Sequence, residues 1–217
     1  MIEITQIRRD VTREVFDYQV LLAALSGYSK PRDKITKLLA SGAVVRIKKG
    51  LYCFSESLRK EAISREYVAN LIYGPSYVSL DYALSHHGLI PERVNTITSV
   101  TIGRSRSFHT PLGSFSYRML KESRYALGAA LESVGKATFL MATAEKALAD
   151  KVWADKRIGG FNVADYAAYL SDDLRIERET LRNLDSSRLR DIALAYNSVK
   201  INNLLGYLEG LGRGRRA

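Results

Sequence analysis

Cysteine and histidine are scarce in this chain. Its 217 residues contain one cysteine and three histidines. A single cysteine excludes an intramolecular disulfide, and three histidines beside it leave few ligands for a structural zinc ion. We therefore expect no metal site.

Long apolar segments are also missing. No uninterrupted apolar run approaches the ~20 residues of a membrane span. The opening residues, MIEITQIRRD, lack the apolar core of a signal peptide. The apolar share of 46% and the charged share of 26% lie in the globular range. We expect a cytoplasmic protein with no membrane partner, built as one large domain or two small ones.

The usual catalytic motifs are absent as well. No acidic residue is followed two places later by lysine, and no Asp-x-Asp pair is present to hold metal ions against a nucleotide. No glycine-rich phosphate-binding loop occurs. Asp81, His86 and His87 lie close in sequence, but adjacent histidines at a helix end more often cap carbonyls. We expect no catalytic residues, no cofactor and no enzymatic activity; an active site without a recognised motif stays an alternative.

Positive charge is plentiful and unevenly placed. The chain carries 33 basic and 23 acidic residues, a net charge of +10. Residues 27–60 hold nine basic residues against Asp33 and Glu56, a net charge of +7, and Arg213, Arg215 and Arg216 supply the other three charges. Such concentration predicts a module that binds a polyanion, whereas a charge needed only for solubility would be spread out. A solvated basic face is the alternative.

Two helices are expected at the start of this basic region. Residues 17–25 place apolar side chains at helical spacing after Asp17, a residue type that caps helices. A second helix should run from Pro31 to about Ala40, with Ser29 as the hydroxyl cap and the proline in the first turn.

A hairpin should follow the second helix. Residues 43–47 and 51–54 are short segments rich in strand-forming residues, and the turn between them contains Gly50. The order helix, turn, helix, basic hairpin is typical of a winged helix-turn-helix. We place this domain at residues 1–56; a small structural α/β lobe is the alternative.

The second helix should present a basic face to DNA. With Ile35, Leu38 and Leu39 turned to the core, Thr36 and Lys37 point outward and can enter the major groove. Lysines at the hairpin tip suit phosphate or minor-groove contacts, which position the protein. The expected DNA-binding residues are Lys30, Arg32, Lys34, Thr36, Lys37, Arg46, Lys48 and Lys49.

The remaining residues, 57–217, predict an α/β domain with a small sheet and several helices, so the fold class is α+β. Expected helices cover 56–73, 79–87 and 143–156, with further helices after residue 162; expected strands cover 94–103, 115–120 and 138–142. Residues 104–109 are expected to form a basic, hydroxyl-rich loop.

Two sets of motifs resemble the AbiEi-like antitoxin family. The N-terminal set is Pro31–Ile35, Leu38, Leu39, Gly42 and Val45–Tyr52. The second set is Tyr73–Ser85, Gly88–Glu92, Thr101–Arg104, Thr110–Gly113, Phe115–Tyr117 and Ala142–Asp150, in family order. The resemblance covers about residues 17–155, and the chain is compact for the family.

The resemblance implies an antitoxin of a bacterial type IV toxin–antitoxin, or abortive infection, system. The winged helix would bind double-stranded DNA, an inverted-repeat operator of its own operon, and act as a repressor. The C-terminal domain would counter a nucleotidyltransferase-like toxin without needing a direct complex. One recognition helix per chain means that a palindrome requires two copies, through a dimer or through pairing on DNA.

Two further points stay open. Arg104 and Arg106 lie two apart after a strand, so both could contact one phosphate or an acidic partner in the antitoxin domain. A different class of function is an RNA- or protein-binding regulatory module without an antitoxin role. RNA readers usually expose aromatic side chains for stacking, and we expect Tyr52 and Phe54 to lie on the inner face of the hairpin or on its flanks instead.

Overall fold

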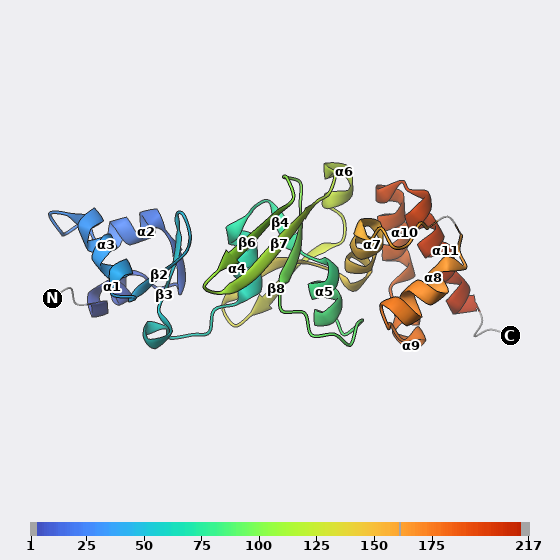
Figure 1. Cartoon of the computed structure of the whole chain (residues 1–217), viewed down its shortest axis with the longest axis horizontal. Helices are drawn as coiled ribbons and strands as arrows, with labels where there is room; N and C mark the ends of the chain where they lie inside the picture. The colour runs from blue at the N-terminus through green and yellow to red at the C-terminus, as the bar shows by residue number, and fades with distance from the viewer. Residues whose placement is uncertain (1–3, 161, 214–217) are drawn as a thin grey trace.

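The computed structural model describes residues 4–160 and 162–213, and its fold is α+β. The molecule is elongated, with a small N-terminal unit at one end, a mixed sheet in the middle and a group of helices at the other end (Figure 1). The two ends of the chain lie at opposite ends of the molecule (Figure 1). Arg215 and Arg216 of the expected basic tail lie outside the described residues.

The N-terminal unit consists of α1 (Ile4–Asp10), β1 (Val15–Asp17), α2 (Tyr18–Ala24), α3 (Pro31–Ala40), β2 (Val44–Lys48) and β3 (Leu51–Phe54). The two expected helices and the hairpin are confirmed, whereas α1 and β1 were not predicted. The strands form an antiparallel sheet in the order β1-β3-β2. β1 has only three residues, too few for a recognisable strand pattern in the sequence, and it forms a strand because it pairs with β3.

Local signals set the ends of these helices. The carboxylate of Asp17 accepts a hydrogen bond of 2.9 Å from the Val20 N–H, so the expected cap is present. The expected Ser29 cap is wrong: the residue that precedes α3 is Lys30, and no side-chain hydrogen bond caps this helix. The proline at the first helical position starts it instead.

β3 is buried on both faces, and this joins the N-terminal unit to the rest of the chain. Tyr52 and Phe54 pack with the residues of α1 to α3, whereas Leu51 and Cys53 belong to the larger core that continues into the second part of the molecule. A strand covered on both sides is apolar at every position, which explains the unbroken sequence Leu-Tyr-Cys-Phe.

The connection between the two parts differs from expectation. A single helix over 56–73 is wrong: a short 3₁₀ turn, η1 (Glu56–Leu58), is followed by an extended segment, and α4 (Arg65–Ile72) begins only later. Ser64 starts α4 by accepting a hydrogen bond of 3.1 Å from the Tyr67 N–H. The guanidinium of Arg59 donates to the Phe54 carbonyl at 2.9 Å and so ties the extended segment back to β3.

A six-stranded mixed sheet forms the middle of the molecule. Its strands are β4 (Ser76–Val78), β5 (Ile97–Thr101), β6 (Arg106–Thr110), β7 (Gly113–Met119), β8 (Ala129–Val134) and β9 (Ala137–Ala142). The order is β6-β7-β5-β4-β9-β8; β5 with β7 and β4 with β9 are parallel pairs, and the other neighbours are antiparallel. The helices α5 (Leu80–His86) and α6 (Glu122–Tyr125) connect strands of this sheet.

Three strands of the sheet agree with the sequence, and three were missed: β4, β6 and β8. β5, β7 and β9 lie where strands were expected. The expected loop over 104–109 is wrong from residue 106, because β6 pairs there with β7, with Phe108 opposite Phe115. β6 is an edge strand whose polar side chains point to solvent, so its sequence looks like that of a loop.

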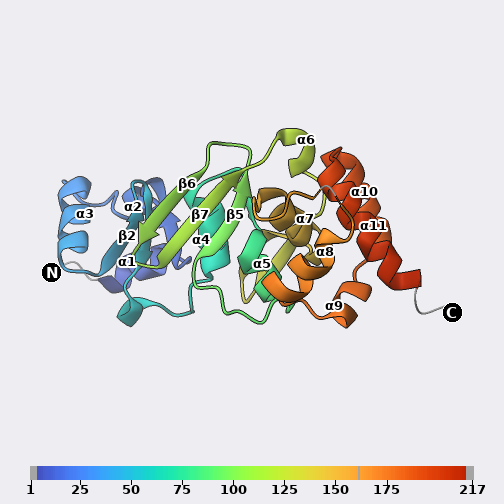
Figure 2. The same ribbon diagram turned by 45° about the vertical axis from the view of Figure 1, so that its right-hand side comes forward.

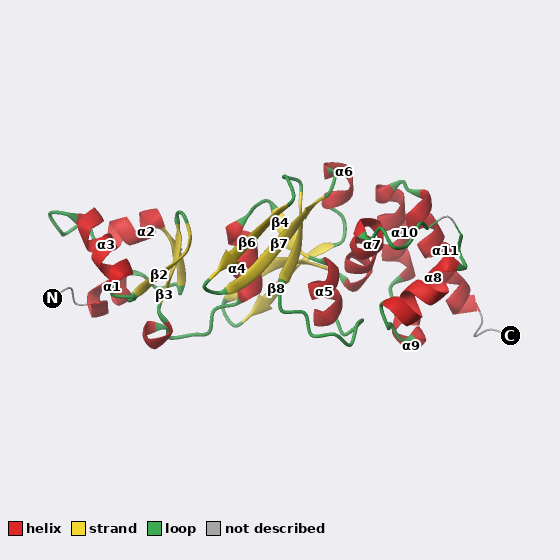
Figure 3. Cartoon of the chain, viewed as in Figure 1, coloured by secondary structure: helices red, strands yellow, loops and turns green. Residues whose placement is uncertain are grey.

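Helices complete the chain, as expected after residue 162 (Figure 3). They are α7 (Ala144–Ala154), α8 (Asp165–Ala168), the π-helical turn η2 (Tyr169–Asp173), α9 (Arg178–Arg182), α10 (Ser186–Tyr196) and α11 (Val199–Arg213). One apolar core runs from the sheet through α7 into α10 and α11. Among the residues described, none of the helices is long and apolar enough to cross a membrane.

Candidate nucleic-acid interface

Helix α3 lies at the free end of the molecule, away from the six-stranded sheet in both views (Figures 1 and 2). Ile35 and Leu38 are 5% and 4% exposed and anchor its inner face in the N-terminal core. Thr36 and Lys37 are exposed on the opposite face, as the helical spacing predicts. No part of the second half of the chain covers this face of α3 in these views.

The positive charges of the N-terminal unit are largely without acidic partners. The exposed basic residues are Lys30, Arg32, Lys37, Arg46 and Lys49. None of them forms an ion pair with a residue that the structure describes. Cations without carboxylate partners produce a positive potential over α3 and the hairpin.

Lys34 and Thr36 are partly engaged within the unit. The Lys34 ammonium lies 4.8 Å from the centroid of the Tyr28 ring, a cation–π contact, and the residue is half-buried. The Thr36 hydroxyl donates a hydrogen bond of 3.2 Å to the Arg32 carbonyl one turn earlier. Thr36 lies on the exposed face of α3.

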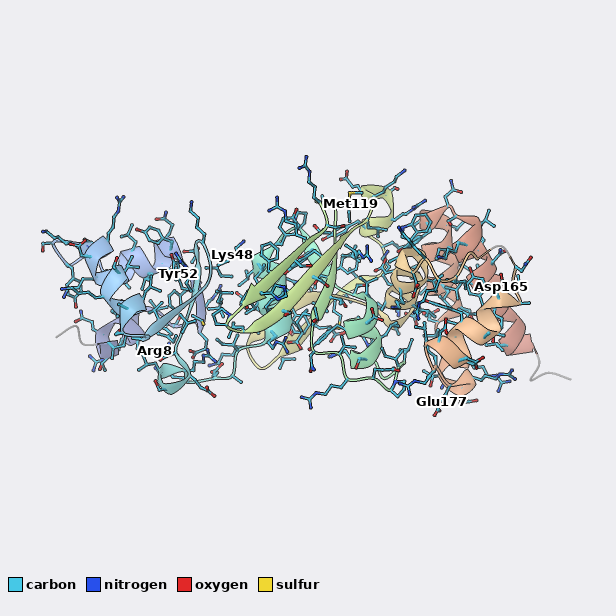
Figure 4. The ribbon with its side chains drawn as sticks, viewed as in Figure 1. Arg8, Lys48, Tyr52, Met119, Asp165 and Glu177 are labelled. Atoms are coloured by element: carbon cyan, nitrogen blue, oxygen red, sulfur yellow. The ribbon has the colours of Figure 1, made fainter. Side chains whose placement is uncertain are left out.

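Lys48 does not share the exposed surface. Its ammonium donates a hydrogen bond to the carbonyl of Ile72, the last residue of α4. Burial lowers the pKa of the Lys48 ammonium. Figure 4 shows Lys48 on the side of the N-terminal unit that faces the sheet. Of the two lysines at the hairpin turn, only Lys49 is exposed, so Lys48 is not free for its expected phosphate contact in this conformation.

Arg104 and Arg106 belong to a different surface. Arg104 precedes β6, and Arg106 begins it, at the edge of the six-stranded sheet. Both are exposed, and neither forms an ion pair with a described residue. The Arg106 guanidinium lies 5.5 Å from the centroid of the Tyr73 ring. Tyr73 follows Ile72 directly, so Arg106 and the hairpin lysine Lys48 contact adjacent residues.

The aromatic residues of the hairpin are not available for base stacking. Tyr52 is 6% exposed and Phe54 is fully buried. The Phe54 ring packs 4.8 Å from Phe16, centroid to centroid, and the guanidinium of Arg8 lies 4.5 Å from the centroid of the same ring. The expected inward orientation of these two residues is confirmed.

A buried polar network in the second part of the molecule was missed by the sequence analysis. The ammonium of Lys146 lies 3.0 Å from the carboxylate of Asp150, one turn further along α7, and both residues are almost fully buried. Asp150 also accepts hydrogen bonds from the hydroxyls of Tyr77 at 3.0 Å, of Ser79 at 2.6 Å and of Tyr196.

This network joins the sheet to the C-terminal helices. Lys146 donates to the Arg124 carbonyl at 2.7 Å and to the Tyr196 hydroxyl at 3.0 Å, so α6, α7 and α10 meet there. Burial lowers the pKa of the Lys146 ammonium, and the attraction of Asp150 opposes this shift. Lys146 and Asp150 are 0% and 2% exposed, so the network lies in the interior of the molecule, where it holds these elements together.

The histidines near α5 do not converge on a metal site. The ring of His87 donates a hydrogen bond of 2.8 Å to the Ala142 carbonyl, and Asp81 pairs with Lys151 at 2.6 Å. Over residues 4–160 and 162–213, no group of three or more His, Cys, Asp or Glu side chains is placed to hold a metal ion.

Comparison with known proteins supports the fold but assigns no function. No protein-family model and no curated protein matches the sequence. Among solved structures, the chain is similar to the crystal structure of the RV2827C protein from Mycobacterium tuberculosis, with a TM-score of 0.53 and 19% identity. The match covers 97% of this chain and 79% of that one, so the two proteins share an α+β fold along nearly the whole of this sequence.

Proposed function

We propose that this protein is a DNA-binding regulator whose N-terminal unit is a winged helix-turn-helix. The observation that supports this most directly is the exposed outer face of α3, at the free end of the molecule (Figure 1), surrounded by basic residues that form no ion pair with any residue the structure describes. A helix of this kind fits the major groove of B-DNA, with its N-terminal half near the base edges.

The exposed residues divide into two roles in this proposal. Thr36 and Lys37 face outward from α3 and would contact base edges, which gives sequence preference. Lys30, Arg32, Arg46 and Lys49 surround the helix and would contact phosphates, which gives affinity and position. Lys48 has no role at the duplex in this conformation, because its ammonium is bonded to Ile72.

The antitoxin role rests on the family resemblance described above. We propose that the protein represses its own operon by binding an inverted repeat. We further propose that its second part counters a nucleotidyltransferase-like toxin, with no need for a stable complex. The cytoplasm is the compartment in which such a regulator would meet DNA.

The hairpin does not support RNA binding, the alternative function. Tyr52 and Phe54, the aromatic residues of β3, are buried in the N-terminal core. Single-stranded RNA is usually recognised by stacking of bases on exposed aromatic rings. A regulator that binds double-stranded DNA therefore fits the exposed groups better.

Fluorescence anisotropy with a labelled duplex of random sequence tests the DNA-binding proposal. We expect the full chain to bind duplex DNA more tightly than single-stranded RNA of equal length, with affinity falling steeply as salt rises. The Arg32→Ala variant should bind duplex more weakly than the wild type. Arg178→Ala removes an exposed arginine of α9, near the far end of the molecule (Figure 1), that forms no ion pair with a described residue, and this variant should bind as the wild type does.

Equal weakening by Arg32→Ala and Arg178→Ala would contradict the proposal, since binding would then depend on net charge alone. Tighter binding to single-stranded RNA would favour the alternative. The antitoxin role is tested separately: a co-transcribed neighbouring gene for a nucleotidyltransferase-like protein would support it, and expression of that gene should arrest growth only when this chain is absent.

A further inference from the structure

Strand β8 forms one edge of the six-stranded sheet. Among the described strands, it pairs with β9 alone. Leu131 of β8 lies opposite Leu140 of β9, and the two residues are 71% and 38% exposed. An edge strand with exposed apolar side chains is a place where a further strand can add to a sheet.

The backbone groups of Leu131 point to the free side of β8. In an antiparallel pair, opposite residues alternate between pairs that exchange both backbone hydrogen bonds and pairs that exchange none. The side chain of Asn70 bonds both backbone groups of Leu140: its amide nitrogen lies 3.4 Å from the carbonyl oxygen, and its oxygen accepts from the N–H at 2.6 Å. Leu131 and Leu140 are therefore a pair that exchanges none, and the N–H and C=O of Leu131 are directed away from β9. Within the part of the chain that the structure describes, no residue bonds them.

The two edges of the sheet differ in charge. β6, at the other edge, exposes Arg106 and His109, and charged side chains on an edge strand hinder pairing with a further strand. The hairpin of β8 and β9, residues 129–142, contains one acidic and one basic residue, Glu132 and Lys136, and so has no net charge. In a chain with a net charge of +10, this hairpin is a surface on which two copies can meet without repulsion between like charges.

We propose that β8 pairs with β8 of a second copy of this chain, antiparallel, about a two-fold axis at Leu131. With the axis there, the outward N–H of each Leu131 donates to the C=O of the other. The same axis places Leu140 and Leu131 of both copies in one row of four leucines across the joined sheets. Glu132 then lies opposite Ala130 of the second copy, whereas an axis at Glu132 would set two carboxylates directly opposite each other.

Sedimentation velocity of the full chain, without DNA, tests this pairing independently of the proposed DNA binding. We expect a dimer whose fraction rises with protein concentration. Leu131→Lys should weaken dimerisation at least about tenfold, because it removes two leucines from the interface and sets two ammonium groups opposite each other. The Leu131 side chain is mostly exposed in the single chain, so the variant should keep its fold, which circular dichroism verifies.

Leu194→Lys is the matched control. Leu194 is 78% exposed on α10, outside β8, and its replacement changes the net charge equally. This variant should dimerise as the wild type does. Equal loss of dimer in the two lysine variants would overturn the proposal, because the loss would then follow from net charge and not from β8.

A mixture of two variants tests the position of the axis. Leu131→Lys and Leu131→Glu should each be largely monomeric alone, because like charges meet at the axis. An equimolar mixture should contain more dimer than either variant, because the lysine of one chain then lies opposite the glutamate of the other. A mixture with no more dimer than its components would contradict an axis at Leu131. A wild type that stays monomeric at every concentration would leave the β8 edge to a strand of another protein and overturn the assignment of a second copy.

Discussion

Lys146 and Asp150 carry opposite charges in the interior of the molecule, where isolated charges are unstable. Each is almost fully buried, and four hydrogen-bond donors converge on the single carboxylate of Asp150. A buried ion pair contributes little net stability relative to an apolar pair, yet removal of one member leaves a buried charge uncompensated. The network therefore constrains how α7 meets the sheet and α10.

We predict that Asp150→Asn destabilises the protein by ~3 kcal/mol, because the Lys146 ammonium then stays buried without a counter-charge. Adding Lys146→Met should recover part of this stability, since the double variant has no buried charge and asparagine still offers an acceptor to the Tyr77 and Ser79 hydroxyls. Urea unfolding followed by circular dichroism measures both variants. A double variant less stable than Asp150→Asn alone would show that the ion pair itself stabilises the fold.

The spacing of Lys146 and Asp150 could have indicated this pair, but it could not have placed it in the core. A lysine and an aspartate four apart on a helix usually meet at the surface. Only the packing of Tyr77 and Tyr196 from distant segments shows that this pair faces inward. Lys48 and Lys49 are a second example. The sequence gives no reason to assign different roles to two adjacent lysines in a turn, but in the structure the Lys48 ammonium donates a hydrogen bond to the Ile72 carbonyl and Lys49 is exposed.

The hairpin and α3 are the elements on which DNA recognition depends. α3 presents Thr36 and Lys37 at the free end of the molecule, and the hairpin lies between α3 and the sheet in both views (Figures 1 and 2). Since Lys48 anchors the hairpin to α4, only Lys49 projects freely from its turn.

We predict that Lys49→Ala lowers the slope of log affinity against log salt by about 0.9, because one phosphate is then no longer neutralised by the protein. Lys48→Ala should leave this slope unchanged, because its ammonium is bonded to the Ile72 carbonyl. Anisotropy titrations at several salt concentrations measure both. An equal decrease for Lys48→Ala would mean that the hairpin leaves α4 when it binds DNA.

The strand β6 carries the second basic pair. We predict that Arg104→Ala with Arg106→Ala leaves duplex affinity within a few-fold of the wild type but impairs protection against the toxin. The two arginines lie at the edge of the sheet, and residues 61–140 hold only eight basic residues against six acidic ones, a small excess of positive charge for binding a duplex. Gel-shift titration and toxin co-expression on the same variant distinguish the two effects. A large drop in duplex binding in a folded variant would extend the DNA footprint along β6, next to the hairpin.

Over the whole molecule, sequence periodicity predicted the elements with strong local signals. The α+β class, α2, α3, the hairpin and the helices after residue 162 all have caps, turns or apolar spacing of their own. The strands that were missed, β1, β4, β6 and β8, are edge or short strands, which exist because a neighbour pairs with them. The packing of Leu51 and Cys53 against the second part likewise depends on residues far away in sequence.

That packing bears on how the two parts behave when they are separated. We predict that a fragment of residues 60–217 folds, binds no DNA specifically and retains any toxin-neutralising activity. It should also bind more of a hydrophobic dye than the full chain, because the surface that Ile47, Leu51 and Cys53 cover is exposed by the cut. Circular dichroism confirms folding, and co-expression measures protection. A folded fragment without protection would show that repression, and not the second part, protects the cell.

Selection of duplexes from a random library, followed by sequencing, examines whether α3 reads DNA sequence. We predict that the wild-type chain enriches one motif, arranged as an inverted repeat. A variant with Thr36→Ala and Lys37→Ala should still retain duplexes through the surrounding cations but should enrich no motif, because the outward side chains of α3 are gone. Enrichment of the same motif by this variant, or failure of the wild type to enrich any sequence, would contradict the assignment of α3 as the recognition helix.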